Sequence, residues 1–212
     1  MKYIIMAGGN YEQFKTPKHL TVLNGERIID RTIRLLKENG VKNIYISSNN
    51  PLFDSCDAPR LINEKNNFKT DMKNTQGYWL DAFYPVEEPV TYIFGDVYFS
   101  SDAINKIVNY KTNKNILFGT KDALNVYHQN WGEPFAYIVN DYKTFFKGVN
   151  EVKKLYDEGK IARHPIVWEL YRYLHNLDIN IQNITVDYEI IDDETMDIDT
   201  PEEAKELERK LK

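Results

Sequence analysis

The chain begins with a short apolar run that breaks abruptly into glycine. Residues 2–6 (KYIIM) read as a buried strand, and Ala7-Gly8-Gly9 follows them directly. Glycine has no Cβ and tolerates positive φ, so successive backbone N–H groups can converge there on one anion. Lys18, stiffened by the proline before it, can supply a point charge to the same phosphates. Paired glycines alone also suit an ordinary turn, but with this lysine they predict a nucleotide site.

Strand and helix patterns alternate along the rest of the chain. Residues 27–39 carry an apolar stripe at helical spacing, Gly40 ends them, and residues 43–47 form the next buried strand. Further strands are expected at 60–62, 89–94, 115–119, 135–139, 181–186 and 196–198. Further helices are expected at 77–83, 102–110, 142–156, 165–174 and from 201 onward. We therefore predict an α/β fold: a single three-layer α/β/α domain over residues 1–212, with a mostly parallel mixed sheet.

Composition restricts the partners and the compartment. The net charge is −5 and 42% of the residues are hydrophobic, so a real core is expected and a nucleic-acid partner is not. Cys56 is the only cysteine, which favours a reducing compartment. The glycines interrupt the N-terminal apolar run, and no stretch approaches the roughly 20 apolar residues that span a bilayer. We expect a cytoplasmic protein without a membrane partner, for which a homodimer is allowed.

The strand at 89–94 leads into a carboxylate. It is strongly apolar and ends in Gly95-Asp96. Ligands of open α/β sheets bind beyond the carboxyl ends of the strands, so Asp96 should lie near the glycines that follow the first strand. An acidic protein that acts on an NTP needs Mg²⁺, which one or two carboxylates and phosphate oxygens usually hold. Asp96 is thus a candidate magnesium ligand and catalytic residue; the alternative is a helix cap or loop aspartate.

A second candidate ligand precedes the last helix. Thr200 is a good N-cap and Glu203 completes a capping box, so these residues need no functional explanation. The capping box does not account for Asp199. Asp197 would point the same way in an extended segment. We take Asp199 as the preferred second magnesium ligand and Asp197 as the alternative ligand or a supporting group.

Two helix entries offer weaker signals. Gly77 precedes the expected helix at 77–83, whose N-terminal partial charge could attract the nucleotide; a plain helix start explains it equally. Arg163 and His164 stand directly before Pro165 at another helix entry. They could bind a phosphate of a second substrate, or simply lie at the surface.

These motifs resemble those of the nucleotidyltransferase family with the GT-A-like, nucleotide-diphospho-sugar transferase fold. Sugar-phosphate nucleotidylyltransferases, CMP-sugar synthetases and molybdenum-cofactor guanylyltransferases open with a similar strand, a similar Ala-Gly-Gly and a loop to Pro-Lys. Gly95-Asp96 looks like the metal motif of the family, and residues 199–202 (DTPE) are similar to the CMP-sugar synthetase segment whose first aspartate is the second metal ligand. The chain departs from the pattern at Gln13, which stands where an arginine is usual. Either Lys15 supplies that charge, or the grip on the triphosphate is weaker.

The resemblance implies a Mg²⁺-dependent enzyme that transfers an NMP group, CMP favoured, from an NTP to a small phosphorylated acceptor such as a sugar phosphate, releasing pyrophosphate. Nucleotide binding would occupy about residues 1–100 and acceptor binding about 101–212. The implied roles then fall on the residues of this sequence as follows: nucleotide binding on Ala7, Gly8, Gly9, Gln13, Lys15, Lys18 and Gly77; acceptor binding on Glu133, Arg163 and His164; catalysis on Lys18 and Asp96; and Mg²⁺ binding on Asp96 and Asp199.

Two other readings stay open. A glycosyltransferase that uses a nucleotide-sugar donor shares this fold, but an Asp-x-Asp after a middle strand would favour it, and residues 95–98 (GDVY) lack the second aspartate. A non-catalytic nucleotide-binding homologue is favoured by Gln13 and opposed by the retention of Lys18, Asp96 and Asp199.

Overall fold

Strand β1 (Lys2–Met6) lies inside the main sheet and pairs in parallel with β4 (Ile44–Ser47) and β8 (Val90–Phe94). The computed structural model describes residues 1–8, 14, 16–66, 69–70, 75–124 and 132–211. Four of the five residues of β1 are buried, and all five of β8 are. Such strands, covered on both faces, read in the sequence as continuous apolar runs.

The main sheet has seven strands in the order β12-β10-β11-β8-β1-β4-β5. The remaining members are β5 (Arg60–Leu61), β10 (Ile116–Gly119), β11 (Pro134–Val139) and β12 (Tyr188–Ile190). Strand β11 pairs antiparallel with both of its neighbours, whereas the other pairings are parallel. The sheet is therefore mixed and mostly parallel, as predicted.

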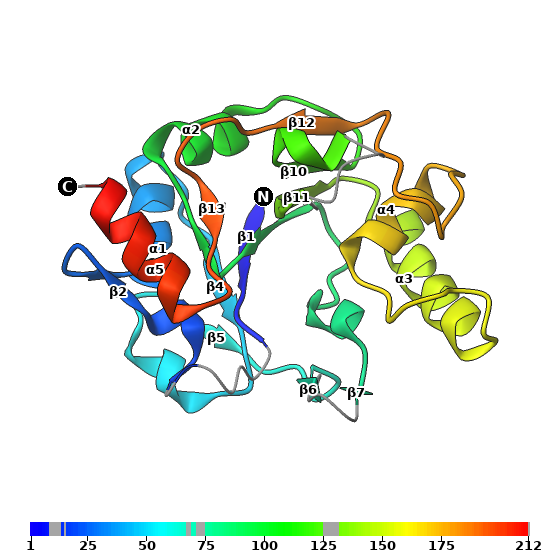
Figure 1. Cartoon of the computed structure of the whole chain (residues 1–212), viewed down its shortest axis with the longest axis horizontal. Coiled ribbons are helices and arrows are strands. Elements are labelled where there is room, and N and C mark those ends of the chain that lie inside the picture. The colour runs from blue at the N-terminus through cyan, green and yellow to red at the C-terminus, as the bar shows by residue number, and fades with distance from the viewer. Residues whose placement is uncertain (9–13, 15, 67–68, 71–74, 125–131, 212) are drawn as a thin grey trace.

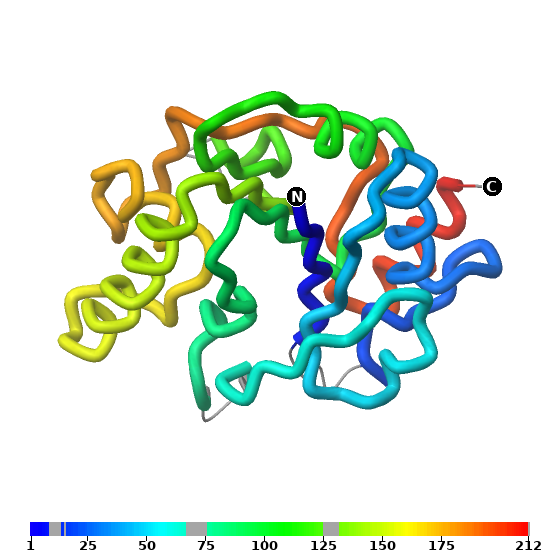
Figure 2. Tube along the Cα trace, turned by 180° about the vertical axis from the view of Figure 1, so that it is seen from behind, coloured from blue at the N-terminus to red at the C-terminus, as the bar shows by residue number. Residues whose placement is uncertain are grey.

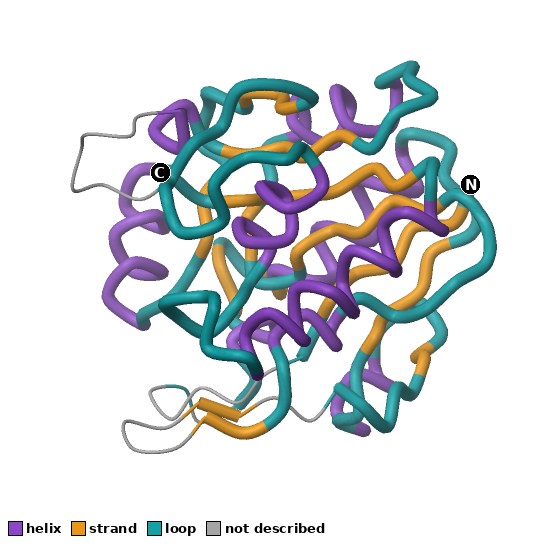
Figure 3. Tube along the Cα trace, turned by 90° about the vertical axis from the view of Figure 1, so that its right-hand side faces the viewer, coloured by secondary structure: helices purple, strands orange, loops and turns teal. Residues whose placement is uncertain are grey.

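Helices cover both faces of this sheet (Figures 1 and 2). They are α1 (Ile28–Glu38), α2 (Ser101–Asn109), α3 (Tyr142–Asp157), α4 (Val167–Leu174) and α5 (Pro201–Lys210). Helix α1 packs with α2, and α3 packs with α4. Figure 3 shows helices lying in front of the strands of the sheet. The three-layer α/β/α arrangement predicted from the alternating pattern is confirmed.

An aromatic cluster joins α3 to the sheet. The Phe145 ring of α3 is buried and lies 5.0 Å from Phe83, 5.2 Å from Tyr137 and 6.1 Å from Tyr92, between ring centroids. Such aromatic pairs stabilise beyond their buried area by about 0.5–1.5 kcal/mol each. This packing anchors the α3–α4 layer behind β8 and β11, the strands whose ends approach the candidate site.

Three small antiparallel pairs accompany the main sheet. They are β2 (Val22–Leu23) with β3 (Glu26–Arg27), β6 (Lys69–Thr70) with β7 (Thr75–Gln76), and β9 (Val97–Tyr98) with β13 (Met196–Asp197). The β9–β13 pair matters most here, because it brings the segment before the last helix back to the end of β8. In the part of the chain that the structure describes, no helix is long and apolar enough to cross a membrane.

Two predicted elements are wrong. The expected strand at 181–186 is not a strand; β12 lies further on, and Ile181 and Val186 are about half exposed. Hydrogen bonds from α4 hold this segment instead, with Arg172 donating to the Ile179 carbonyl and the Gln182 side chain. The expected helix at 77–83 is only a 3-10 helix at Trp79–Ala82. Pro85 follows closely and would cost a longer α-helix a hydrogen bond.

Candidate active site

Asp96 stands where β8 leaves the sheet, and Gly95 makes its position possible. The Gly95 N–H donates to the Met6 carbonyl at 3.0 Å. A Cβ at Gly95 would lie 2.5 Å from that carbonyl oxygen, a distance that real Cβ atoms essentially never show. Only glycine lets β8 end this close to β1, so Asp96 lies beside the Ala7–Gly8 turn.

Asp197 and Asp199 reach the same place through the β9–β13 pair. The Ile198 N–H donates to the Asp96 carbonyl at 3.1 Å. The predicted capping box is present: the Thr200 hydroxyl accepts from the Glu203 N–H, and the Glu203 carboxylate accepts from the Thr200 N–H. It also accepts from the Asp199 N–H at 2.8 Å. The start of α5 thus orients Asp199 toward the end of β8.

Lys18 lies between these carboxylates. It begins a 3-10 helix, Lys18–Leu20, directly after Pro17, and its side chain is 1% exposed. The Nζ atom lies 2.6 Å from Asp199 Oδ1, 2.7 Å from Asp96 Oδ2 and 3.8 Å from Asp197 Oδ1. Segments from the start, the middle and the end of the chain therefore meet around one ammonium group.

The carboxylates share this cation unequally. Burial has the largest single influence on Asp96 and opposes its ionisation, but the charge and hydrogen bond of Lys18, with smaller contributions, together hold the pKa of Asp96 below its ordinary value. Burial and the Asp96 charge raise the pKa of Asp197 well above its ordinary value. Burial also lowers the pKa of His19 to about 4, so this neighbour adds no positive charge at neutral pH. One lysine balances the cluster incompletely.

The donor set fits a hard divalent cation at the position now taken by the ammonium. Among the described residues, no three His, Cys, Asp or Glu side chains are arranged as a metal site. However, carboxylate oxygens of Asp96 and Asp199 already converge on Lys18 Nζ at 2.6–2.7 Å. Carboxylate oxygens are the ligands that Mg²⁺ prefers. Asp96 and Asp199, with Asp197 beside them, can hold such an ion once the lysine side chain turns away.

A cavity of about 220 Å³ opens beside this cluster. Its described lining combines Lys18 and the three aspartates with Gly8, Asn66 and Glu133 and with an apolar wall that includes Trp79, Phe94, Pro134, Ile166 and Val167. Burial raises the pKa of Glu133 to about 7, with further contributions from Asp199 and Asp96. The cavity therefore offers a charged end at the carboxylates and an apolar side wall, an arrangement suited to a polar ligand with a flat or alkyl portion.

The other sequence-predicted residues divide into three groups. Ala7, Gly8 and Glu133 lie at the site, with Ala7 buried at the end of β1 and the other two lining the cavity. Gly9, Gln13 and Lys15 lie outside the described residues. Gly77 has a φ of 71° and precedes the short 3-10 helix, so the helix-terminal charge expected there is absent.

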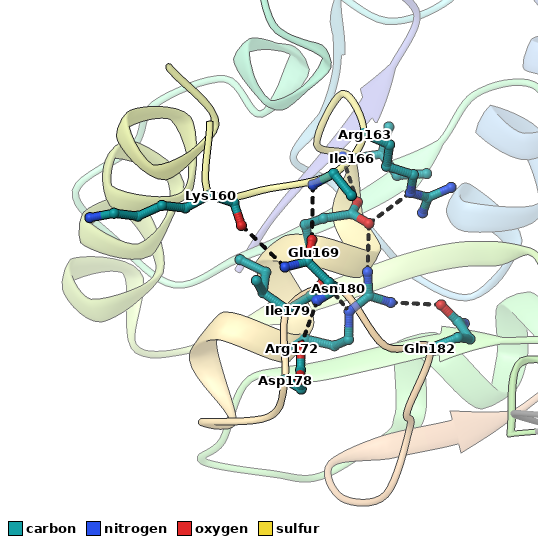
Figure 4. A network of polar contacts seen from close by, with 10 residues as sticks. Lys160, Arg163, Ile166, Glu169, Arg172, Asp178, Ile179, Asn180 and Gln182 are labelled. Carbon is teal, nitrogen blue, oxygen red and sulfur yellow. Dashed lines mark hydrogen bonds and ion pairs between the residues drawn. The ribbon is translucent and has the colours of Figure 1, made fainter. Parts of the chain in front are cut away.

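Arg163 and His164 are engaged in structural contacts. Arg163 Nε donates to Glu169 Oε1 at 2.8 Å, within the network shown in Figure 4. His164 Nε2 accepts from the Trp79 N–H at 3.2 Å, and its ring stacks on Tyr78. It is Ile166, two residues later, that reaches the cavity. These contacts attach α4 to the segment that carries Trp79, and thereby shape the apolar wall.

Trp79 and Asn66 are among the cavity-lining residues that sequence reasoning missed. Trp79 left no signal beyond its aromatic character, because its place depends on the tertiary contact with His164. Asn66 lies in an irregular stretch of the chain, where a neutral amide looks like any turn residue.

One comparison with known proteins shows a family, and another shows a shared fold. Residues 3–140 match the family described as the MobA-like NTP transferase domain.

Among solved structures, CTP:phosphocholine cytidylyltransferase from Streptococcus pneumoniae is 19% identical with a TM-score of 0.61, over 100% of this chain and 99% of that one. The inositol-1-phosphate CTP transferase from T. maritima is 12% identical with a TM-score of 0.60, over 99% and 95%. The 4-diphosphocytidyl-2C-methyl-D-erythritol synthase from Anaerococcus prevotii DSM 20548 is 13% identical with a TM-score of 0.57, over 99% and 97%. No curated protein matches by sequence. At these identities the structural likeness establishes the fold.

Proposed function

The chain belongs to the MobA-like NTP transferase family, and from that premise we propose that it transfers CMP from CTP to a small phosphorylated acceptor, with release of pyrophosphate. One observation carries the proposal. At the carboxyl end of the sheet, beside Gly8 and a cavity, Lys18 Nζ lies within 2.7 Å of a carboxylate oxygen of Asp96 and of one of Asp199. Phosphoryl transfer needs positioning and charge stabilisation rather than a protein nucleophile, and this cluster offers both.

The reaction would proceed by in-line displacement. An oxygen of the acceptor phosphate attacks the α-phosphorus of the NTP, the bond from that phosphorus to the bridging oxygen breaks, and pyrophosphate leaves with the electron pair. Backbone N–H groups after β1 would hold the phosphates where Gly8 allows close approach. Asp96 and Asp199 would hold Mg²⁺, which supplies charge neutralisation for the phosphate oxygens when bound.

Lys18 would have two positions. In the described structure its ammonium is bound to the carboxylates of Asp96 and Asp199. A metal ion bound by the same carboxylates would repel that ammonium, which would turn toward the nearest remaining anion, the triphosphate. The lysine would then stabilise charge on the phosphate oxygens. Its pairing with these carboxylates is thus compatible with its predicted phosphate-binding role.

The nucleotide and the acceptor class rest on weaker support. Residues 199–202 (DTPE) favour CTP through their similarity to CMP-sugar synthetases. Two structures with the same fold are named for CTP chemistry with phosphocholine or inositol-1-phosphate, and a third is named for a diphosphocytidyl product. We propose an acceptor of that kind, sugar phosphates included. It would approach from the side of Glu133 and the apolar wall, within residues 101–212, while residues 1–100 bind the nucleotide.

Pyrophosphate release tests the proposal. The purified protein would be mixed with Mg²⁺, one of CTP, UTP, GTP, ATP or dTTP, and one of a panel of sugar, polyol and amino-alcohol phosphates. We expect release with a single NTP, CTP first, and a loss of about 100- to 1000-fold in Asp96→Asn. Asp102→Asn, an exposed aspartate in the first turn of α2, is the matched control and should keep full activity. Activity that survives Asp96→Asn would sink the assignment of this site.

A further inference from the structure

Asn66 is buried without hydrogen-bond partners for its side chain. The residue is 8% exposed, and neither Oδ1 nor Nδ2 has a partner among the described residues. A buried amide left unpaired is destabilising, because it has lost its hydrogen bonds to water without replacement. Buried polar groups are nearly always satisfied, so an exception calls for an explanation. Asn66 lines the cavity, and a ligand in that cavity is the simplest partner.

Hydrogen bonds hold the backbone of Asn66, whereas its side chain makes none among the described residues. The Asn66 N–H donates to the Asn63 carbonyl at 2.8 Å. Asn49 clamps the same loop: its Nδ2 donates to the carbonyls of Asn63 and Asn66 at 2.7 and 2.9 Å, and its Oδ1 accepts from the Asn63 N–H at 3.0 Å. Asn49 follows β4, so the clamp fixes the loop to the edge of the sheet. The side chain of Asn66 is therefore presented at a set position rather than left mobile.

That position is directly over Gly8. A Cβ at Gly8 would lie 2.8 Å from both Oδ1 and Nδ2 of Asn66. Gly8 follows β1 at the carboxyl edge, where the proposed function places the nucleotide. The charged groups of the site are Lys18 and the aspartates, which suit phosphates and a metal ion. A neutral amide that offers a donor and an acceptor side by side suits a different part of the nucleotide.

On the basis of the proposed function, we infer that Asn66 hydrogen-bonds the edge of the nucleobase. Its Oδ1 would accept from the exocyclic amino group of cytosine, and its Nδ2 would donate to the adjacent ring nitrogen. Asparagine makes bidentate contacts of this kind with base edges. A phosphate offers acceptors only and would satisfy Nδ2 while leaving Oδ1 buried and unpaired. A base edge of this kind gives both atoms of Asn66 a partner.

The test combines a variant with a modified ligand. Binding of CTP, of the CTP analogue that lacks the exocyclic amino group, and of inorganic tripolyphosphate would be measured calorimetrically with Mg²⁺ in the unmodified protein and in Asn66→Ala. We expect the unmodified protein to prefer CTP over the analogue by at least about 10-fold, because a site built to hydrogen-bond a group rejects ligands without it. Asn66→Ala should bind the two equally, and bind tripolyphosphate as before.

Controls separate the possible failures. Asn66→Ala breaks none of the described side-chain hydrogen bonds, so its thermal midpoint without ligand should match or exceed that of the unmodified protein. Asn105→Ala, which removes an exposed amide on α2, should leave all three affinities unchanged. An undiminished preference for CTP in Asn66→Ala would overturn the inference, and so would an equal loss of tripolyphosphate and CTP binding. If the unmodified protein binds no NTP at all, the proposed function itself fails, and the inference with it.

Discussion

Two clusters of buried charge in this molecule are built in opposite ways. Around Glu169 in α4, every charge has its partners: Oε1 accepts from Arg163 and Arg172 at 2.8 and 2.5 Å, and Oε2 accepts from the Ile166 N–H at 2.9 Å. Around Lys18, one ammonium faces three carboxylates at 2.6, 2.7 and 3.8 Å. Figure 4 shows the first network, whose charged side chains are not among the residues that line the cavity, although Ile166 is.

The difference separates a structural network from a candidate site. Both clusters contain side chains that are 3% exposed or less, so burial alone does not distinguish them. In the Glu169 network two guanidinium groups bind one carboxylate, and both oxygens of that carboxylate have donors within the protein. The Lys18 cluster has an excess of negative charge and opens onto a cavity, so a cation or a substrate would improve it. Unbalanced buried charge of this kind is a signature of functional sites.

Removing the buried cation from the Glu169 network should have the largest effect. Arg172→Met leaves Glu169 buried with one cation fewer, and we expect a loss of about 3–5 kcal/mol in the free energy of unfolding. Arg163→Met is the comparison, because this side chain is 44% exposed and should cost about 1 kcal/mol or less. Urea denaturation of both variants measures the difference. Equal losses would show that Arg163 and Arg172 contribute equally to stability and that burial does not determine the size of the contribution.

The same change in the unbalanced cluster should be reversible by a metal ion. Lys18→Met removes the cation from two partly buried carboxylates, Asp96 and Asp197, and from the exposed Asp199, and we expect a loss of about 2–4 kcal/mol without added metal. Millimolar Mg²⁺ should recover most of it, since a cation at 100 times its Kd adds about 2.7 kcal/mol.

The control for Lys18→Met is Lys153→Met, which breaks another partly buried ion pair, with Asp81 at 2.6 Å. Thermal unfolding with and without Mg²⁺ would be recorded for both variants. Mg²⁺ should not restore Lys153→Met. If Mg²⁺ fails to stabilise Lys18→Met, the three carboxylates do not form a metal site.

A pH series should show the cost of ionising Glu133 in the folded state. Its pKa rises from 4.5 to about 7 on folding, so the folded state holds the proton more tightly. That stability is fully present below about pH 4.5 and is lost as the pH rises through about 7, by roughly 1–3 kcal/mol. Glu133→Gln carries no such proton. Between pH 4.5 and 8 the stability of the variant should therefore rise relative to that of the unmodified protein, as measured by urea midpoints at each pH. A difference in stability that does not change with pH would contradict the assigned pKa.

Relieving the excess charge should give the smallest effect, a stabilisation. Asp197 has a pKa raised well above its ordinary value, so its charge is unfavourable at neutral and higher pH. Asp197→Asn removes that charge and keeps the oxygen that accepts from the Ile198 N–H at 2.8 Å. We expect a gain of about 1 kcal/mol at pH 8 without metal. Destabilisation by Asp197→Asn at pH 8 would mean that the charge of Asp197 is favourable in the folded state and that the cluster has no excess of negative charge.

The sequence was most informative where chemistry and local pattern coincide. The apolar strands at 2–6 and 89–94 predicted the core of the sheet, and the rule that ligands bind at the carboxyl ends of strands placed Asp96 near Gly8. The capping box left Asp199 unexplained, which directed attention to it. These inferences depend on short segments whose meaning is local, and the structure brings those segments together.

What the sequence could not predict depends on distant contacts. The pairing of β9 with β13 sets the geometry of Asp197 and Asp199, yet each strand is only two residues long. Arg163 read as a phosphate ligand because its partner, Glu169, becomes visible only when α4 folds. Asn66 gave no signal, because the lack of a hydrogen-bond partner is a property of the tertiary structure.

The central claim is that Asp96 and Asp199 exchange Lys18 for a metal ion when a nucleotide binds. The most direct measurement is the thermal midpoint of the unmodified protein and of Asp96→Asn with saturating CTP, each with and without Mg²⁺. We predict a rise of roughly 5–10 °C in the unmodified protein only when both ligands are present, and little rise in Asp96→Asn. A rise of the same size without Mg²⁺, or one that persists in Asp96→Asn, would contradict it.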